Sequence, residues 1–98
     1  MENKTLALAC GLLALTLSGA AQAQTEIQWW HSMTGGNGDR VNAMASGFNA
    51  TQKDYKVVAV YKGGYAESMT AAIAAYRAGA APHIVQVFEV GTATMMSA

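Results

Sequence analysis

The chain has 98 residues, and its six Lys and Arg side chains balance its six Asp and Glu side chains, so its formal net charge is zero. The two signs are interspersed and form no basic stripe, so neither a nucleic-acid partner nor an anionic membrane surface is expected. A single cysteine excludes an internal disulfide, and two histidines without ligand spacing, His31 and His83, are a poor signature of a metal site.

Residues 1–23 have the pattern of a secretory signal peptide. Lys4 supplies the positive start, residues 6–17 are mostly apolar, and residues 21–23 (Ala-Gln-Ala) match the small-x-small pattern of a cleavage site. The apolar stretch is shorter than the roughly 20 residues that a membrane span needs. The sequence therefore predicts export and cleavage, and Cys10, which lies inside the apolar stretch, is removed with the signal.

The rest of the chain alternates between predicted strands and predicted helices. Short runs rich in β-branched or aromatic residues predict strands at residues 26–30, 56–61 and 84–88. Apolar residues that recur every three to four positions predict helices over residues 39–52 and 65–78. A third helix begins after Gly91, near the last residue, so we read the chain as the N-terminal piece of a longer, full-length protein.

Local signals set the expected bounds of the two helices. Residues 35–38 hold three glycines and are typical of a flexible loop, after which Asn37 or Asp39 is available to cap the first helix. Gly79 fits the C-terminal cap of the second helix, and Pro82 fits a stop just beyond it. The apolar stripe of the first helix consists of Val41, Met44, Ala45 and Phe48.

This order of elements implies an α/β fold. The connections are too long for hairpins, so we expect three parallel strands joined by right-handed crossovers. Every strand-to-helix loop of such a sheet emerges at its carboxyl edge. Three loops, at residues 31–38, 62–65 and 89–92, should therefore meet at one edge, and each precedes a helix N-terminus that suits a polar or anionic ligand.

Glu89 and Tyr65 are the candidate ligand-binding residues at this edge. Glu89 directly follows an apolar strand, where a carboxylate can accept two hydrogen bonds from a vicinal diol or an amine. The alternative for Glu89 is a helix-capping acid. Tyr65 is either a wall of the pocket or an aromatic residue at a helix start that packs on the sheet. Sequence position alone leaves both alternatives open.

Other candidate residues favour structural roles. His31 and Ser32 are adjacent, so they cannot by themselves form a nucleophile–base pair. His83 is better explained as a loop or strand-start residue than as a metal ligand. Trp29 and Trp30 point to opposite faces of a regular strand, and core packing explains both better than ligand stacking does.

Several separated motifs together resemble a known family. They are Trp-His-Ser-Met at residues 30–33, Tyr-Lys-Gly at 61–63 followed by Tyr65, Ala-Ala-Pro at 80–82 leading into Gln-Val at 86–87, and Glu-Val-Gly-Thr-Ala-Thr-Met-Met at 89–96. In this order and spacing they resemble the start of a periplasmic solute-binding protein of an ABC importer (extracellular solute-binding protein family 1). The nearest group takes up sn-glycerol-3-phosphate and glycerophosphodiesters such as glycerophosphocholine. The glycine-rich residues 34–38 depart from the family pattern.

The resemblance implies a two-lobed periplasmic-binding-protein fold of type II, of which residues 24–98 would be an incomplete N-terminal lobe. The lobes would close on the ligand, and the full-length monomer would dock on an ABC permease and ATPase complex in the inner membrane. Tyr65 and Glu89 correspond to family residues on the glycerol side of the ligand, whereas the phosphate contacts lie further along. The resemblance implies a binding protein rather than an enzyme, with no cofactor.

Two other functions remain as alternatives. A sugar-binding protein of the same fold would hold hydroxyl groups with Glu89 and an aromatic residue equally well. A secreted glycerophosphodiester hydrolase, or a glycosidase, would use Glu89 as an acid or base, but it needs a second carboxylate or a metal cluster nearby. Three strands and fewer than three full helices cannot cover both faces of a sheet, so residues 24–98 alone are expected to be unstable.

Overall fold

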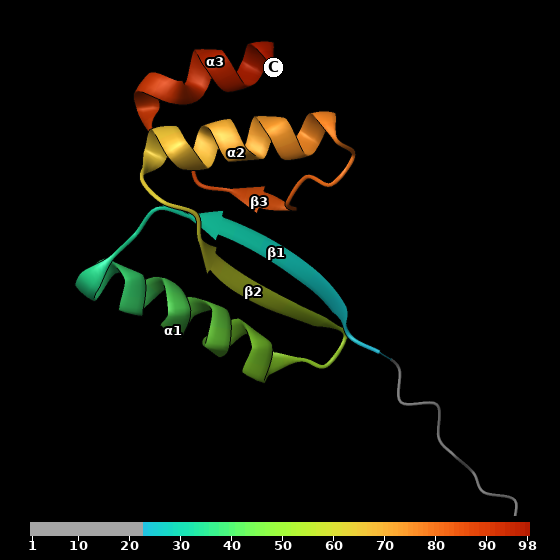
Figure 1. Cartoon of the computed structure of the whole chain (residues 1–98). Coiled ribbons are helices and arrows are strands. Elements are labelled where there is room, and N and C mark those ends of the chain that lie inside the picture. The colour runs from blue at the N-terminus through green and yellow to red at the C-terminus, as the bar shows by residue number, and fades with distance from the viewer. Residues whose placement is uncertain (1–22) are drawn as a thin grey trace, which may run out of the picture.

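The computed structural model describes residues 23–98, which form a parallel sheet with helices on both of its faces (Figure 1). The predicted signal peptide, residues 1–23, lies outside the described residues except for its last one. The elements are β1 (Thr25–His31), α1 (Gly35–Thr51), β2 (Tyr55–Tyr61), α2 (Tyr65–Arg77), β3 (Ile84–Val85), a 3₁₀ turn η1 (Glu89–Gly91) and α3 (Thr92–Ser97). No helix among the described residues has the length and apolar character needed to cross a membrane.

The sheet has the strand order β2-β1-β3, and both pairings are parallel. Helix α1 lies on one face, and α2 and α3 lie on the other (Figure 1). The crossover from β1 to β2 passes over one face through α1, and the crossover from β2 to β3 passes over the other face through α2. The two crossovers run in opposite directions across the sheet and use opposite faces, so both have the same hand. The predicted α/β class and parallel order are confirmed, and all three strands end at one edge.

The two tryptophans of β1 lie on opposite faces of the sheet, as predicted. Trp29 lines a surface cavity with Ala45 and Phe48 of α1, so its side chain is on the α1 face. Trp30 lies on the α2 face, where its indole Nε1 donates a hydrogen bond to the Gln28 side chain at 3.3 Å. The alternation of the strand thus separates the two rings although they are adjacent in sequence.

The hydrophobic core of the described residues is small. Only Val41, Ala45 and Ala72 are buried apolar residues within residues 23–98. The predicted stripe of α1 is therefore half right, because Met44 and Phe48 are 59% and 45% exposed. A three-stranded sheet with a two-residue β3 has too little surface to cover them.

The predicted start of the first helix is wrong. We expected a flexible loop before Asp39 and a side-chain cap, but α1 already begins at Gly35, and Thr34 at the N-cap makes no side-chain hydrogen bond. Asn37 lies inside the helix and accepts a hydrogen bond from Arg40 at 3.0 Å. Gly35 has a φ of 55°, a backbone conformation that glycine adopts readily, so it serves as the entry to the helix.

The predicted third strand, residues 84–88, is too long. Only Ile84–Val85 is strand, although the Gln86 N–H still donates to the Trp30 carbonyl at 2.9 Å. The partner strand turns away just beyond this point, and the Gln86 side-chain oxygen instead accepts the Ser32 N–H at 3.0 Å. The chain after Gln86 has no backbone partner in the sheet, so its apolar residues leave the sheet and turn into η1.

His83 lies directly before β3, as predicted for a loop or strand-start residue, and its contacts extend the pairing of β3 with β1. Its backbone N–H donates to the Gln28 carbonyl at 3.1 Å. Its ring Nδ1 accepts the Gln28 N–H at 2.9 Å, in the place of a backbone carbonyl. Both backbone polar groups of Gln28, its N–H and its carbonyl, are therefore satisfied by one residue.

Candidate functional site

The three strand-to-helix loops are fastened to one another at the carboxyl edge of the sheet. The Lys62 N–H donates to the His31 carbonyl at 3.0 Å, which ties the loop after β2 to the end of β1. The Ser32 N–H donates to the Gln86 side chain, which ties the loop after β1 to the segment after β3. The three loops therefore form one connected surface.

An aromatic stack joins the loop after β2 to the segment after β3. Tyr65 is the first residue of α2 and is 37% exposed. Its ring stacks on that of Phe88, with the ring centroids 5.0 Å apart and the ring planes 17° apart. Phe88 directly precedes Glu89, so the stack brings the Tyr65 ring next to the segment that carries Glu89. The ligand contact expected of Tyr65 stays a prediction.

Glu89 is the exposed first residue of the 3₁₀ turn η1, in the strand-to-helix connection where we expected it. A carboxylate in the first turn of a helical segment interacts favourably with the free N–H groups there. Its position therefore fits the helix-start alternative as well as ligand binding, and its hydrogen-bond acceptors face solvent. Binding of a ligand by Glu89 stays a prediction.

Glu67 has a structural task at the start of α2. Its Oε2 accepts the N–H of Gly64, the N-cap residue, at 3.2 Å. Gly63 has a φ of 91°, and a side chain there would collide with the Glu67 carboxylate. Residues 23–98 hold no group of three or more His, Cys, Asp or Glu side chains that could bind a metal ion. The described residues thus give a hydrolase neither a free second carboxylate from Glu67 nor a metal cluster.

Lys62 places a positive charge near the carboxyl edge, on the α2 face of the sheet. Its Nζ lies 4.1 Å from the centroid of the Trp30 ring, a cation–π contact. Sequence reasoning missed the contacts of both Lys62 and Phe88. The contact of Lys62 follows from the strand register in the structure, where Val60 pairs with Trp30 and the residue two positions on shares its face.

His31 is buried beneath this edge. It is 3% exposed, and its ring lies 6.1 Å, between centroids, from the rings of Trp29 and Tyr61. Its Nδ1 accepts the Met33 N–H at 3.2 Å, which places the proton of the neutral ring on Nε2. Burial disfavours the charged imidazolium and lowers the pKa of His31 below its usual value of 6.5.

The stability of a folded protein that contains this chain is expected to fall as the pH drops below about 6.5. The pKa of His31 is lower in the folded state than in the unfolded state, so the unfolded chain takes up the proton first. The His31 contribution is fully present above the unfolded pKa and is lost as the pH falls towards the folded pKa. One proton limits the loss to about 1.4 kcal/mol per pH unit.

Urea unfolding at pH values of about 7.5, 6.5 and 5.5 measures this loss as the change in the free energy of unfolding. The matched variant is His31→Asn, which keeps a side-chain acceptor for the Met33 N–H but cannot titrate. We expect a smaller pH dependence in the variant than in the wild type. Equal slopes in the two proteins would show that His31 does not carry the effect.

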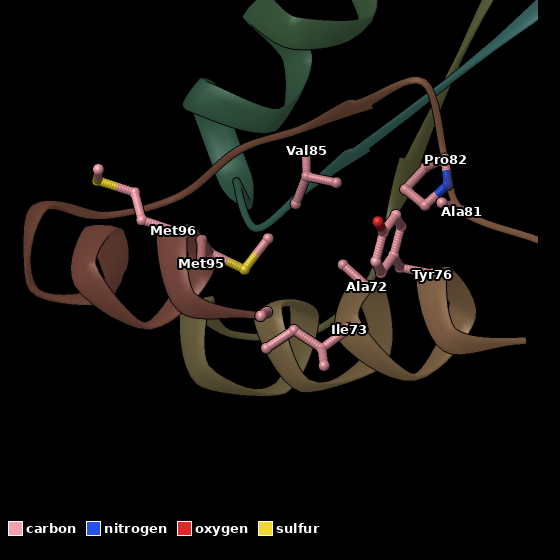
Figure 2. Close-up of a pocket in the computed structure, with 9 residues that line it drawn as sticks. Ala72, Ile73, Tyr76, Ala81, Pro82, Val85, Met95 and Met96 are labelled. Atoms are coloured by element: carbon pink, nitrogen blue, oxygen red, sulfur yellow. The ribbon is translucent and has the colours of Figure 1, made fainter. Parts of the chain in front are cut away.

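An apolar pocket of about 400 Å³ lies on the α2 face, between α2, α3 and the segment that leads into β3 (Figure 2). Its lining is Ala72, Ile73, Tyr76, Ala81, Pro82, Val85, Met95, Met96 and Ala98. None of these side chains is charged, and neither Tyr65 nor Glu89 is among them. The pocket therefore suits the packing of apolar side chains better than the binding of a polyol or a phosphate.

Curated relatives cover nearly all of this chain. Over 88 residues it is 57% identical to a protein of Yersinia pestis bv. Antiqua (strain Antiqua). The aligned segment covers 90% of this chain and 20% of that protein. A protein of Yersinia enterocolitica is 56% identical over 88 residues, which are again 90% of this chain and 20% of that protein. A protein of Brucella abortus (strain 2308) is 48% identical over 94 residues, which are 96% of this chain and 22% of that protein. Each is named sn-glycerol-3-phosphate-binding periplasmic protein UgpB.

No protein-family model matches the chain. The chain spans about one fifth of the length of the curated relatives that it matches. The resemblance found in the motifs thus extends to an alignment over 90% of the chain, in which 57% of the residues are identical. Over that length, the chain is a homologue of the periplasmic sn-glycerol-3-phosphate-binding proteins.

Proposed function

We propose that this chain forms the first part of the N-terminal lobe of a periplasmic solute-binding protein that captures sn-glycerol-3-phosphate for an ABC importer. The observation that carries the proposal is the 57% identity, over 90% of the chain, to a protein named for binding this ligand. The carboxyl edge supports it, because Tyr65 and Glu89 follow β2 and β3, the two parallel strands that flank β1. Glycerophosphodiesters such as glycerophosphocholine share the glycerol group and are further candidate ligands.

Binding needs no chemical step in this proposal. The Glu89 carboxylate accepts hydrogen bonds from the glycerol hydroxyls, and charge-assisted bonds of this kind are short and strong. The Tyr65 ring forms an apolar wall beside the carbon chain. The phosphate is held by the remainder of the protein, and closure of the two lobes excludes water from the ligand.

The proposal also assigns a route and partners to the protein. Residues 1–23 direct export to the periplasm and are removed there. The closed, ligand-loaded monomer then docks on the permease and ATPase complex of the inner membrane. The relatives are named as binding proteins, which favours a transport component over an enzyme.

The decisive test is the affinity of a full-length binding protein for sn-glycerol-3-phosphate with Glu89→Gln. A practical host is a chimera in which this chain replaces the matched segment of the Yersinia pestis relative. Hydrogen bonds to a charged group contribute about 1.5–3 kcal/mol, so we expect the Kd to rise by about ten- to 150-fold. Isothermal titration calorimetry measures the change.

Glu26→Gln is the matched control for this variant. Glu26 has the same carboxylate, and it lies at the amino end of β1, the opposite edge of the sheet from Glu89. We expect Glu26→Gln to leave the Kd unchanged. An unchanged Kd in Glu89→Gln would remove Glu89 from the site.

The same chimera separates the two alternative functions. A maltose-like sugar that competes with sn-glycerol-3-phosphate would favour a sugar-binding protein. Release of free alcohol from glycerophosphocholine by pure protein would favour a hydrolase. The proposal expects neither result, and it expects saturable binding of sn-glycerol-3-phosphate without turnover.

A further inference from the structure

Among the described residues, one aromatic side chain stacks on the Tyr65 ring. Phe88 covers one face of the ring in a near-parallel stack, and 37% of Tyr65 stays exposed. The chain before Tyr65 is a pair of glycines, and Gly63 has a φ of 91°. The Gly64 N–H donates to the Glu67 carboxylate at 3.2 Å, so the backbone is held there, and the freedom that the ring retains is rotation about its side-chain bonds.

Phe88, in contrast, is held firmly by its surroundings. Its carbonyl accepts the Gly91 N–H at 2.9 Å and so closes the 3₁₀ turn that follows. Its ring lies against that turn, because a Cβ on the buried Gly91 would be 3.1 Å from Phe88 Cε1 and 2.9 Å from the Met69 sulfur. Phe88 is therefore a fixed support that touches both the turn carrying Glu89 and the ring of Tyr65.

We propose that Phe88 is a positioning residue of the ligand site, which holds the Tyr65 ring in its binding orientation relative to Glu89. This inference rests on the proposed function. A stacked aromatic partner restricts the ring before the ligand arrives, so less conformational freedom is lost on binding. The wall formed in this way is flat and apolar beside a carboxylate, which suits a small polyol phosphate that offers hydroxyl groups on one side and C–H groups on the other.

The test measures the Kd of the chimera for sn-glycerol-3-phosphate with Phe88→Leu. Stacked aromatic pairs have coupling energies that correspond to about a twofold to tenfold change in an equilibrium constant, so the Kd should rise by that factor. Phe88→Tyr keeps the ring and should restore the wild-type Kd. Phe88→Met keeps apolar volume without a ring, and it replaces Phe88→Leu if circular dichroism shows that the latter does not fold.

A double-mutant cycle separates positioning from a general structural role. If Phe88 acts through Tyr65, then Phe88→Leu should have no further effect on the Kd once Tyr65→Leu is present. A structural role would weaken binding by the same factor in both backgrounds. A second readout is the ring-proton NMR signal of Tyr65 without ligand, which Phe88→Leu should shift, while the exposed Tyr76 serves as the unstacked control.

The outcomes of these tests are distinguishable. The positioning role is overturned if Phe88→Leu leaves the Kd unchanged while Tyr65→Leu raises it, or if the two effects simply add. It is also overturned if Tyr65→Leu has no effect, in which case Tyr65 leaves the site. The proposed function itself fails only if the parent chimera does not bind sn-glycerol-3-phosphate, or if Glu89→Gln and Tyr65→Leu both leave the Kd unchanged.

Discussion

Residues 24–98, expressed alone, should show no cooperative thermal unfolding transition. Fixing the backbone of one residue costs about 1–2 kcal/mol of conformational entropy, which burial of apolar surface must offset. Within residues 23–98 only three apolar residues are buried, whereas the side chains of Phe48, Tyr76 and Met96 are 45%, 65% and 84% exposed. So small a core cannot offset that cost, and the exposed apolar side chains favour aggregation.

Differential scanning calorimetry and circular dichroism check this expectation. The isolated segment should give a broad, non-cooperative change or should aggregate, and it should bind a hydrophobic dye before heating. The chimera contains the same residues and should give a cooperative transition. It is therefore the control which shows that these residues can fold when the rest of the protein is present. A sharp transition with matched calorimetric and van't Hoff enthalpies in residues 24–98 alone would contradict the expectation.

The parts of the fold that the sequence predicted well depend on local signals. The second helix was expected over residues 65–78 and is observed as Tyr65–Arg77. Gly79 follows it with a φ of 72°, which is the left-handed conformation that a C-terminal glycine cap requires. Propensity, periodicity and cap residues all act within one turn of the chain, so a single sequence contains them.

The third strand shows why other parts were predicted wrongly. Residues 84–88 form a β-branched and apolar run, but a strand also needs a partner along its length. The partner strand ends at His31, and only Ile84 and Val85 pair with it. The Gln86 side chain then takes the Ser32 N–H that a longer strand would have used. This replacement of a backbone partner by a side chain depends on the geometry of a distant loop, so no local sequence signal predicts it.

The candidate site likewise has features that the sequence predicted and features that it could not predict. The meeting of the three loops at one edge follows from parallel topology, so it was predicted from the order of elements alone. The stack of Tyr65 on Phe88 joins residues on separate elements, and the ring positions depend on the turn at Gly91. Sequence position could not show this contact, and the ligand roles of Tyr65 and Glu89 remain predictions for the binding tests.

Gly91→Val should destabilise the chimera and weaken its ligand binding together. Gly91 is buried, and a Cβ there would lie 2.9 Å from the Met69 sulfur and 3.1 Å from the Phe88 ring. Its φ is −84°, which any residue adopts, so the effect comes from packing rather than from backbone strain. Inserting a methyl group into such a contact costs about 1–3 kcal/mol, and the two further carbons of valine should cost more.

Urea unfolding and calorimetry of Gly91→Ala and Gly91→Val in the chimera measure the two effects. We expect the free energy of unfolding to decrease from the parent to Gly91→Ala and again to Gly91→Val. The Kd should increase along the same series, because the added carbons displace Phe88 and with it Tyr65. The matched control is Gly47→Ala in α1, where a Cβ has no neighbour within 4 Å and where alanine favours the helix by about 1 kcal/mol. That variant should be at least as stable as the parent and should bind with the same Kd. If Gly91→Ala behaved like Gly47→Ala in both measurements, close packing of Phe88 on the 3₁₀ turn would not be what holds the carboxyl edge together.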